Sequence, residues 1–306
     1  MPKPRVLIVS SRPDWHGQRL LKALTNAGAD ARVTSLDACG FAIGSGNAGL
    51  SIPESQDRLP DAVVVRTVGG GTFEQVTMRL SVLHALSDLG VVVYNPPRAI
   101  ERCVDKSMTS FILSHAGLPT PATWTTENAV QAAELVQQET AQGHQVVLKP
   151  LFGAQGIGLK LMNNSDQLPA PDAIGGAYYL QRYIPAPENK WRDWRVLVVG
   201  GKAEAAMMRV GKSWITNVRQ GASCVAAPAT GELAQLSIEA AKAVGTLYAG
   251  VDLVLDQEGR FTILEVNSMP AWRGLQSVTE FDIATLLASD IMNRVPADKA
   301  RQHGRA

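Results

Sequence analysis

Residues 250–268 read Gly250-Val-Asp252-Leu-Val-Leu-Asp-Gln-Glu-Gly259-Arg-Phe-Thr-Ile-Leu-Glu265-Val-Asn267-Ser268, and this segment decides the fold. Two apolar runs flank the sequence Asp-Gln-Glu-Gly, in which the glycine supplies a residue with positive φ. The segment therefore predicts a β-hairpin near the C-terminal end of the chain.

Oxygen-bearing side chains gather on one face of this predicted hairpin. Side chains alternate along a strand, so Glu265 and Asn267 share a face. A turn centred on residues 257 and 258 adds Asp252 to that face, within about one residue pair of Glu265. The opposite, packing face would carry Val251, Leu253, Leu264 and Val266. Two carboxylates and one amide oxygen then converge, with no nearby Lys or Arg to neutralise them.

Such a set of oxygen ligands has two interpretations. It suits Mg²⁺ or Mn²⁺ held together with a substrate phosphate. It is also what the solvated polar face of a half-exposed sheet looks like, and for a hairpin by itself this is the commoner case. The rest of the chain has to decide between them.

Composition describes an ordinary globular protein. The chain has 306 residues, 45% of them hydrophobic and 19% charged, with a net charge of +1, which allows two or three packed units and argues against nucleic-acid or membrane partners. Its three cysteines and five histidines are scattered, so neither a zinc site nor a disulfide framework is expected. With no signal peptide and no apolar run of membrane-spanning length, we expect a cytoplasmic protein.

The first 97 residues predict an open parallel α/β unit, because short apolar strands alternate with helices. The expected strands lie at 5–10, 33–36, 61–66 and 90–94, and the helices at 18–26 and 73–89. The glycines at 69–71 do not make a dinucleotide-binding fingerprint, since no Gly-x-Gly-x-x-Gly follows the first strand. Asn95-Pro96-Pro97 marks the boundary of the unit.

A Gly-rich loop follows the next predicted strand. That strand ends at Lys149-Pro150, and Leu151-Phe-Gly153-Ala-Gln-Gly156-Ile-Gly158 comes after it. Such a loop can lay backbone N–H groups over phosphates while the lysine neutralises them. It is not a Walker loop, because no Gly-Lys-Ser/Thr follows, and alone it is weak support for nucleotide binding.

Three stretches together resemble the ATP-grasp superfamily and, within it, the RimK-type α-L-glutamate ligases. They are 147–158, Asp193-Trp-Arg195-Val-Leu-Val-Val-Gly-Gly201, and Gly250-Val-Asp252 with Leu264-Glu265-Val-Asn267-Ser-Met-Pro270. The likeness runs to about residue 292. It implies an α/β and α+β chain with the ATP-grasp fold. The N-terminal open parallel α/β (pre-ATP-grasp) domain would span 1–97, and the linker helices and the lid with the Gly-rich loop would span 98–184. A C-terminal subdomain with the metal site would follow at 185–295, and a disordered tail at 296–306.

The resemblance also implies a set of ATP-binding and metal-binding residues. Lys106 and Lys149 would contact the phosphates, and Asp193 would lie near the ribose. The mobile flap would include Gly153, Gln155, Gly156 and Gly158, and the adenine pocket would be lined by Gln181, Arg182, Tyr183 and Ile184. Two Mg²⁺ or Mn²⁺ ions bridging the β- and γ-phosphates would be held by Asp252, Glu265 and Asn267, which favours the metal-site interpretation of the hairpin.

The reaction of this family explains these residue types. A carboxylate attacks the γ-phosphate of ATP to give an acyl phosphate, which an amine then attacks, so catalysis is mostly charge neutralisation and alignment. Arg209 matches the arginine that stabilises the intermediate. The residues facing the substrates would be Asn217, Arg219, Ser268, Trp272 and Arg273.

Departures from the family pattern concern the acceptor more than the reaction. Arg182 stands where the family usually has Glu, and Ile215 where many members have a basic residue. Arg273 and Gln276 replace acidic residues of the ribosomal-protein-modifying members. A planar indole at Trp272 beside the Arg273 guanidinium suits an aromatic, anionic acceptor, such as a pterin or furan cofactor precursor; in the alternative interpretation Trp272 is core and Arg273 a surface charge.

Three functions follow from these observations. The leading one is an ATP- and Mg²⁺-dependent ligase that adds L-glutamate to a small-molecule carboxylate acceptor and releases ADP and phosphate. The second is a RimK-type ligase that acts on a protein or peptide C-terminus or uses another amino acid. The third is a synapsin-like ATP-binding module without chemistry, which would not need the metal ligands and Arg209. The sequence leaves open the acceptor, the number of glutamates, the α or γ linkage, and whether the protein is a homo-oligomer.

Overall fold

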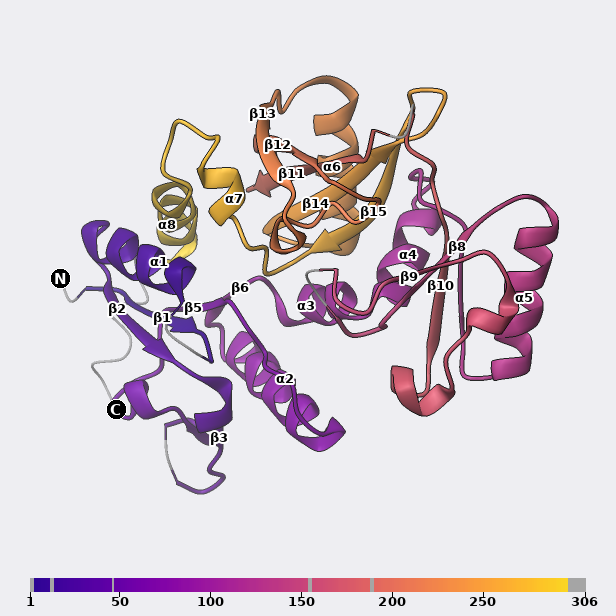
Figure 1. The fold of residues 1–306 in the computed structure, drawn as a ribbon. Coiled ribbons are helices and arrows are strands. Elements are labelled where there is room, and N and C mark those ends of the chain that lie inside the picture. The colour runs from indigo at the N-terminus through magenta and orange to yellow at the C-terminus, as the bar shows by residue number, and fades with distance from the viewer. Residues whose placement is uncertain (1–2, 12–13, 46, 154–155, 188–189, 297–306) are drawn as a thin grey trace. The chain divides into compact units, whose positions relative to one another are not determined.

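The computed structural model describes residues 3–11, 14–45, 47–153, 156–187 and 190–296. From residue 297 onward the tail expected to be disordered lies outside these residues. The chain forms two compact units (Figure 1). The first unit comprises Met1–Glu101, Gly245–Tyr248 and Ser268–Ala306, and the second comprises Arg102–Val244 and Ala249–Asn267. None of the described helices is long and apolar enough to cross a membrane.

The first unit is built on a parallel four-stranded sheet in the order β2-β1-β5-β6. Its strands are β1 (Arg5–Val9), β2 (Asp30–Thr34), β5 (Ala62–Val65) and β6 (Val92–Tyr94). Strands β1 and β5 are buried along their whole length, as expected of parallel strands that are continuously apolar. The prediction of an open parallel α/β unit is confirmed.

The first unit also contains helices, and polar caps set where several of them begin. They are α1 (Trp15–Asn26), α2 (Phe73–Asp88), α3 (Pro97–Val104, which crosses the unit boundary), α7 (Arg273–Gln276) and α8 (Ile283–Arg294). The Asp14 side chain caps α1, a Thr72–Gln75 capping box begins α2, and Asp282 caps α8. Helices α1 and α8 pack together although they lie at opposite ends of the chain. A small hairpin of β3 (Gly40–Phe41) and β4 (Leu50–Ser51) lies between the short helices η1 (Leu36–Ala38) and η2 (Pro53–Ser55).

The second unit contains two sheets. The four-stranded sheet β7-β10-β8-β9 consists of β7 (Thr123–Thr126), β8 (Val146–Lys149), β9 (Lys160–Met162) and β10 (Tyr178–Arg182). The five-stranded sheet β13-β12-β11-β14-β15 consists of β11 (Arg192–Val199), β12 (Lys202–Val210), β13 (Ser223–Ala227), β14 (Tyr248–Leu255) and β15 (Phe261–Asn267). The helices are α4 (Lys106–His115), α5 (Ala129–Ala141), α6 (Gly231–Val244), η3 (Ser165–Gln167), η4 (Pro171–Ile174) and η6 (Val218–Gln220). The expected subdomain boundary at 184–185 falls between the two sheets.

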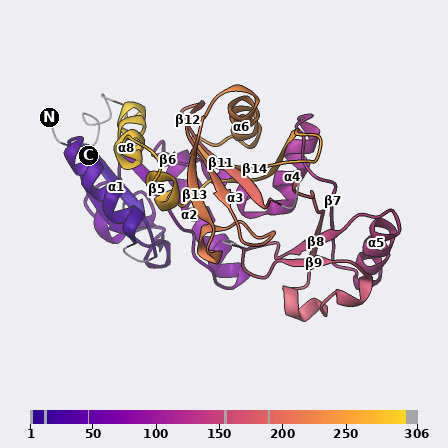
Figure 2. The same ribbon diagram turned by 45° about the horizontal axis from the view of Figure 1, so that its top comes forward.

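The core of the five-stranded sheet determines which side chains are left for function. Helix α6 packs against β11, β12 and β15 (Figure 2). The core residues include Val196, Val198, Val251, Leu253 and Val266. Because side chains alternate, Asp193 and Arg195 on β11 face away from Trp194, which packs against this core.

One side chain of the predicted hairpin lies on the other face from that expected. A β-bulge between Asp252 and Leu253 pairs Leu253 with Ile263, so Ile263 is fully buried in the core and Leu264 is only half-buried. The prediction for Leu264 was wrong because a bulge adds one residue to a strand and reverses the alternation beyond it.

Candidate active site

The oxygen ligands predicted on the hairpin do lie together. Asp252 is the direct cross-strand partner of Glu265, and Gly250 is that of Asn267. The Asn267 side-chain Nδ2 donates a hydrogen bond of 3.0 Å to Glu265 Oε1. Asp252 is buried, whereas the Glu265 side chain is 31% exposed. The convergence of the three side chains is confirmed.

Two arginines neutralise Asp252, contrary to the expectation that no cation lies nearby. Arg195 donates to both carboxylate oxygens, at 2.7 Å from Nε and 2.6 Å from Nη2, and Arg209 Nη2 donates at 2.9 Å. Burial by itself raises the pKa of Asp252, but the two guanidiniums outweigh it and hold that pKa well below its usual range. The expectation considered only the hairpin, and the arginines come from the neighbouring strands β11 and β12.

Arg209 also binds Asp193, its direct cross-strand partner. Its Nε donates to one carboxylate oxygen at 2.6 Å and its Nη2 to the other. Both residues are buried. Burial raises the pKa of the Asp193 carboxyl and the Arg209 charge lowers it. With both oxygens engaged by Arg209, this carboxylate is a counter-ion in the core, and the ribose contact expected of it does not fit the structure.

The two predicted phosphate-binding lysines face the same carboxylate. Lys149 ends β8 and its Nζ donates to Gln181 Oε1 at 2.6 Å. Lys106 is placed in the first turn of α4 by the Asp105 cap, and its Nζ donates to the carbonyls of Leu151 and Gly153. Burial lowers the pKa of both lysines, and the charge of Glu265 is the largest influence that opposes it. The lysines, the Gly-rich loop and Glu265 are therefore in electrostatic contact.

The Gly-rich loop lies against the segment that precedes η6. A Cβ built on Gly156, where φ is +72°, would lie 2.4 Å from Asn217 Oδ1 and 3.1 Å from Ile215 Cγ2. The structure thus brings Gly156 and Asn217 together, and the apolar Ile215 occupies the place beside the loop. A Cβ on Gly158 would lie 2.8 Å from Pro150 Cγ. Gln155 lies outside the described residues, and Arg219 is in η6.

The predicted adenine-pocket residues are largely engaged with the protein. The Gln181 side chain accepts from Lys149 and donates to Thr123 and the Tyr179 hydroxyl, both at 3.1 Å. Arg182 forms a bidentate ion pair with Glu139 on α5, at 2.6 and 2.9 Å. A side-chain contact of either residue with adenine therefore does not fit. The Tyr183 ring packs edge-on against Trp214, with centroids 6.1 Å apart, and Ile184 follows it outside β10.

Two family models match the chain: the RimK PreATP-grasp domain over residues 5–100 and the RimK-like ATP-grasp domain over residues 103–291. The chain belongs to the RimK-like ATP-grasp family. Among its relatives, the tetrahydromethanopterin:alpha-L-glutamate ligase of Methanococcus maripaludis is 34% identical over 235 residues, covering 75% of this chain and 78% of that protein. A probable alpha-L-glutamate ligase of Halorhodospira halophila is 31% identical over 286 residues, covering 91% of this chain and 92% of the relative.

Solved structures agree on the ATP-grasp fold. The ATP-grasp ligase PsnB, complexed with a minimal precursor, superimposes with a TM-score of 0.74 at 22% identity, covering 95% of this chain and 99% of PsnB. The family resemblance and the fold predicted from sequence are both confirmed, and the chain is an ATP-dependent ligase.

The remaining substrate-binding candidates of this RimK-like chain belong to the first unit. Trp272 is 1% exposed. Its ring packs edge-on against His16 with centroids 4.6 Å apart, and the Arg66 guanidinium lies 4.5 Å from its centroid. Trp272 thus has no free face on which an aromatic acceptor could stack, and the alternative interpretation, a core residue, is the one the structure supports. Arg273 is exposed, and Ser268 is buried.

His16 was missed by the sequence analysis, where it was only one of five scattered histidines. Its Nε2 accepts hydrogen bonds from the backbone N–H groups of Trp272 and Arg273, at 3.1 and 3.2 Å. Its Nδ1 lies 3.1 Å from the carboxylate of Asp14, the α1 cap. Burial lowers the pKa of His16, and the Arg66 charge lowers it further. His16 therefore anchors the segment around Trp272 and Arg273 as a neutral acceptor.

The residues of the hairpin fit a metal held jointly with phosphate groups. Within the described ranges, no three His, Cys, Asp or Glu side chains group as a complete metal cage. Glu265 and Asn267 offer a carboxylate and an amide oxygen and leave coordination positions for phosphate oxygens and water, which is how Mg²⁺ is commonly bound. Both oxygens of Asp252 accept hydrogen bonds from Arg195 and Arg209, so a cation there would share this carboxylate with them. Glu265 is half-exposed and its contact with Arg195 is long, at 4.0 Å, so its charge is available to a cation.

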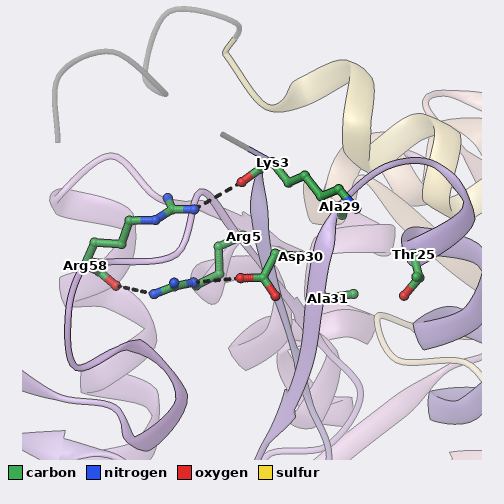
Figure 3. Close-up of a pocket in the computed structure, with 7 residues that line it drawn as sticks. All are labelled: Lys3, Arg5, Thr25, Ala29, Asp30, Ala31 and Arg58. Carbon is green, nitrogen blue, oxygen red and sulfur yellow. Dashed lines mark hydrogen bonds and ion pairs between the residues drawn. The ribbon is translucent and has the colours of Figure 1, made fainter. Parts of the chain in front are cut away.

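A cavity of about 560 Å³ lies elsewhere, in the first unit (Figure 3). Lys3, Arg5, Asp30 and Arg58 line it together with small side chains. Its guanidiniums already have partners, because Arg5 contacts Asp57 at 2.5 Å and Arg58 contacts Asp61 at 2.9 Å. None of the predicted functional residues lines it, so we do not assign it to the ligase reaction.

Proposed function

We propose that this protein joins L-glutamate to the carboxylate of a small acceptor molecule, with cleavage of ATP to ADP and phosphate. The observation that carries the proposal is the convergence, within the second unit, of the Asp252–Glu265–Asn267 set with two half-buried lysines and Arg209. A non-catalytic nucleotide-binding module would have no need for this arrangement.

The proposed reaction has two steps. An oxygen of the acceptor carboxylate attacks the γ-phosphorus of ATP, the bond from that phosphorus to the β-bridging oxygen breaks, and ADP leaves. The amine nitrogen of L-glutamate then attacks the carbonyl carbon of the acyl phosphate. The carbon–oxygen bond to the phosphoryl group breaks, phosphate leaves, and the nitrogen loses its extra proton as the amide forms.

The side chains of this site would act mainly on charge. Lys106 and Lys149 would neutralise phosphate oxygens. Partial burial strengthens the hydrogen bond of each ammonium to an anion, because less water competes with it. When bound, two Mg²⁺ or Mn²⁺ ions held by Asp252, Glu265 and Asn267 would supply further neutralisation of the β- and γ-phosphates. Arg209, fixed by Asp193 and Asp252, would stabilise the negative charge of the intermediate without having to reorient.

For the acceptor we propose a small cofactor precursor of the pterin or furan type. Relatives at 34% identity are tetrahydromethanopterin:alpha-L-glutamate ligases, which supports this class. The solved neighbours bound to precursor peptides are 22% identical or less and bear on the fold alone. A peptide or protein C-terminus is the second candidate, and we expect the reaction to take place in the cytoplasm.

The direct test is release of ADP by the purified full chain with Mg²⁺-ATP, L-glutamate and tetrahydromethanopterin, followed by mass spectrometry of the product. We expect a product heavier by whole glutamyl residues, and no such product with L-aspartate in place of L-glutamate. Arg209→Lys should abolish most of the ADP release, whereas Glu258→Gln, in the exposed turn of the same hairpin, should not. Release of ADP that requires a peptide instead of the pterin would refute the proposed acceptor, and release independent of any amino acid would refute the ligase reaction.

A further inference from the structure

Arg66 is a buried cation without a buried anion. It is the first residue after β5 in the first unit and is 6% exposed. Its Nη1 donates to the neutral hydroxyl of Tyr248 at 3.1 Å, and its guanidinium lies over the ring of Trp272. Among the described residues no carboxylate pairs with it, and its Nε has no hydrogen-bond partner. Burying a charge is costly unless it is paired, so this arrangement requires an explanation.

The other buried arginines donate to carboxylate or carbonyl oxygens, although the Nε of Arg79, like that of Arg66, has no partner. Arg5 contacts Asp30 and Asp57, and Arg209 contacts Asp193 and Asp252. Arg79 donates to the backbone carbonyls of Val68 and Gly70, at 3.4 and 2.9 Å. Arg66 has instead a phenol and an indole face, neither of which balances its charge.

Two further donors near Arg66 are also buried without a partner. They are the Trp272 indole Nε1 and the Ser268 hydroxyl. Trp272 is in contact with the Arg66 guanidinium. Ser268 is linked to Arg66 less directly: Asn95 Nδ2 donates to the carbonyls of both Ser268 and Tyr248, and the Tyr248 hydroxyl, at the far end of that side chain, accepts from Arg66. Three buried donors of the first unit thus lack an acceptor, and two of them, on Arg66 and Trp272, belong to side chains in contact.

The position in the fold is one where α/β sheets bind ligands. In the order β2-β1-β5-β6, strand β2 lies on one side of β1 and β5 on the other, so the strand order reverses at β1. Ligands of such sheets bind outside the carboxyl ends of the strands at this reversal. Arg66 follows β5 there, and Thr67 meets Ser11, which comes just after β1, through a 3.0 Å hydrogen bond from the Ser11 backbone N–H.

We propose that Arg66, Ser268 and Trp272 form a binding site for a substrate carboxylate at this end of the first unit's sheet. The edge of the guanidinium that carries Nε and Nη2 presents two parallel N–H donors, the geometry that matches a carboxylate. The hydroxyl and the indole N–H add neutral donors. One cation with neutral donors suits a singly charged carboxylate better than a phosphate. The inference rests on the proposed function for the source of the carboxylate, which is either L-glutamate or the acceptor.

The test measures binding without turnover. The full chain is saturated with Mg²⁺ and ADP, and L-glutamate or tetrahydromethanopterin is titrated by calorimetry. Arg66→Lys keeps the charge but loses the two-donor edge, and should weaken binding of one of these ligands about tenfold or more. Ser268→Ala and Trp272→Phe each remove one unpartnered donor and should weaken it about fivefold. The control Arg58→Lys alters an ion-paired arginine of the same unit and should change nothing, and ADP binding should be unaffected throughout.

The pattern of losses assigns the ligand. Weaker binding of L-glutamate identifies the incoming amino acid as the source of the carboxylate, and weaker binding of tetrahydromethanopterin identifies the acceptor. If both ligands bind the three variants as they bind the wild type, the unpartnered donors serve only buried water and the site does not exist. Should Arg66→Lys fail to fold, the Ser268 and Trp272 variants decide in the same way. ADP release by the wild type tests the proposed function separately, so the two can fail independently.

Discussion

The ion pair between Arg209 and Asp193 allows a quantitative prediction for Arg209→Gln. Both side chains are buried, and Arg209 holds both oxygens of Asp193. Removing the guanidinium leaves Asp252 with Arg195, whereas Asp193 loses its charged partner. Removing one partner of a buried pair costs about 3–5 kcal/mol, mainly because the other charge stays desolvated.

This cost is a large fraction of the stability of a domain, which is about 5–15 kcal/mol. For a unit of this size, each kcal/mol lowers the unfolding temperature by about 2–4 °C, so Arg209→Gln should lower the transition of the second unit by about 10 °C. The double variant Asp193→Asn, Arg209→Gln removes the stranded charge and should recover about 2 kcal/mol or more of the loss.

Differential scanning calorimetry of the wild type, the two single variants and the double variant tests this reasoning. Hydrogen exchange along β11 and β12 would assign the affected transition to the second unit. A single variant within about 1 kcal/mol of the wild type, or a double variant no more stable than Arg209→Gln, would refute the argument that Asp193 depends on Arg209 for its burial.

Three further predictions concern the metal site, the loop and His16. Glu265→Gln should leave the unfolding temperature unchanged but weaken Mn²⁺ binding to the ADP complex about tenfold or more, as measured by electron paramagnetic resonance; unchanged Mn²⁺ affinity would remove Glu265 from the ligand set. Gly156→Ala should raise KM for ATP about tenfold, because its Cβ would meet Asn217 at a position where φ is +72°. The control Gly176→Ala has φ +83° and no atom within 4 Å of its Cβ, so it should cost only about 1 kcal/mol of folding stability. Because burial lowers the pKa of His16 from 6.5, the unfolded chain binds the proton more readily than the folded chain. The stability that this residue contributes is complete above about pH 6.5 and is lost as the pH falls. Urea unfolding should therefore show a decrease in the free energy of unfolding at acid pH that His16→Gln lacks. Equal pH dependence of the two proteins would contradict the role of His16 as a buried neutral acceptor.

The parts of the active site that depend on local pattern were predictable. Alternation along one strand is enough to bring Glu265 and Asn267 to one face, and the short turn brings the strand of Asp252 beside them. The direct pairing of Asp252 with Glu265 depends in addition on the bulge. The position of Lys149 at the end of a strand before a Gly-rich loop is equally local. Resemblance added the order of the domains and Arg209, which no periodicity identifies.

The sequence by itself therefore determined the parallel first unit and the hairpin with Glu265 and Asn267 on one face, since strand alternation and turn residues act over a few positions. Only the tertiary structure decided that Asp252 is neutralised by Arg195 and Arg209, that a bulge puts Ile263 in the core, and that Trp272 is buried between His16 and Arg66. The physical reason is that these outcomes depend on which distant segments pair and on how much water they exclude. Desolvation and cross-strand pairing are properties of the folded chain, so a charge or an indole acquires its role only from its surroundings.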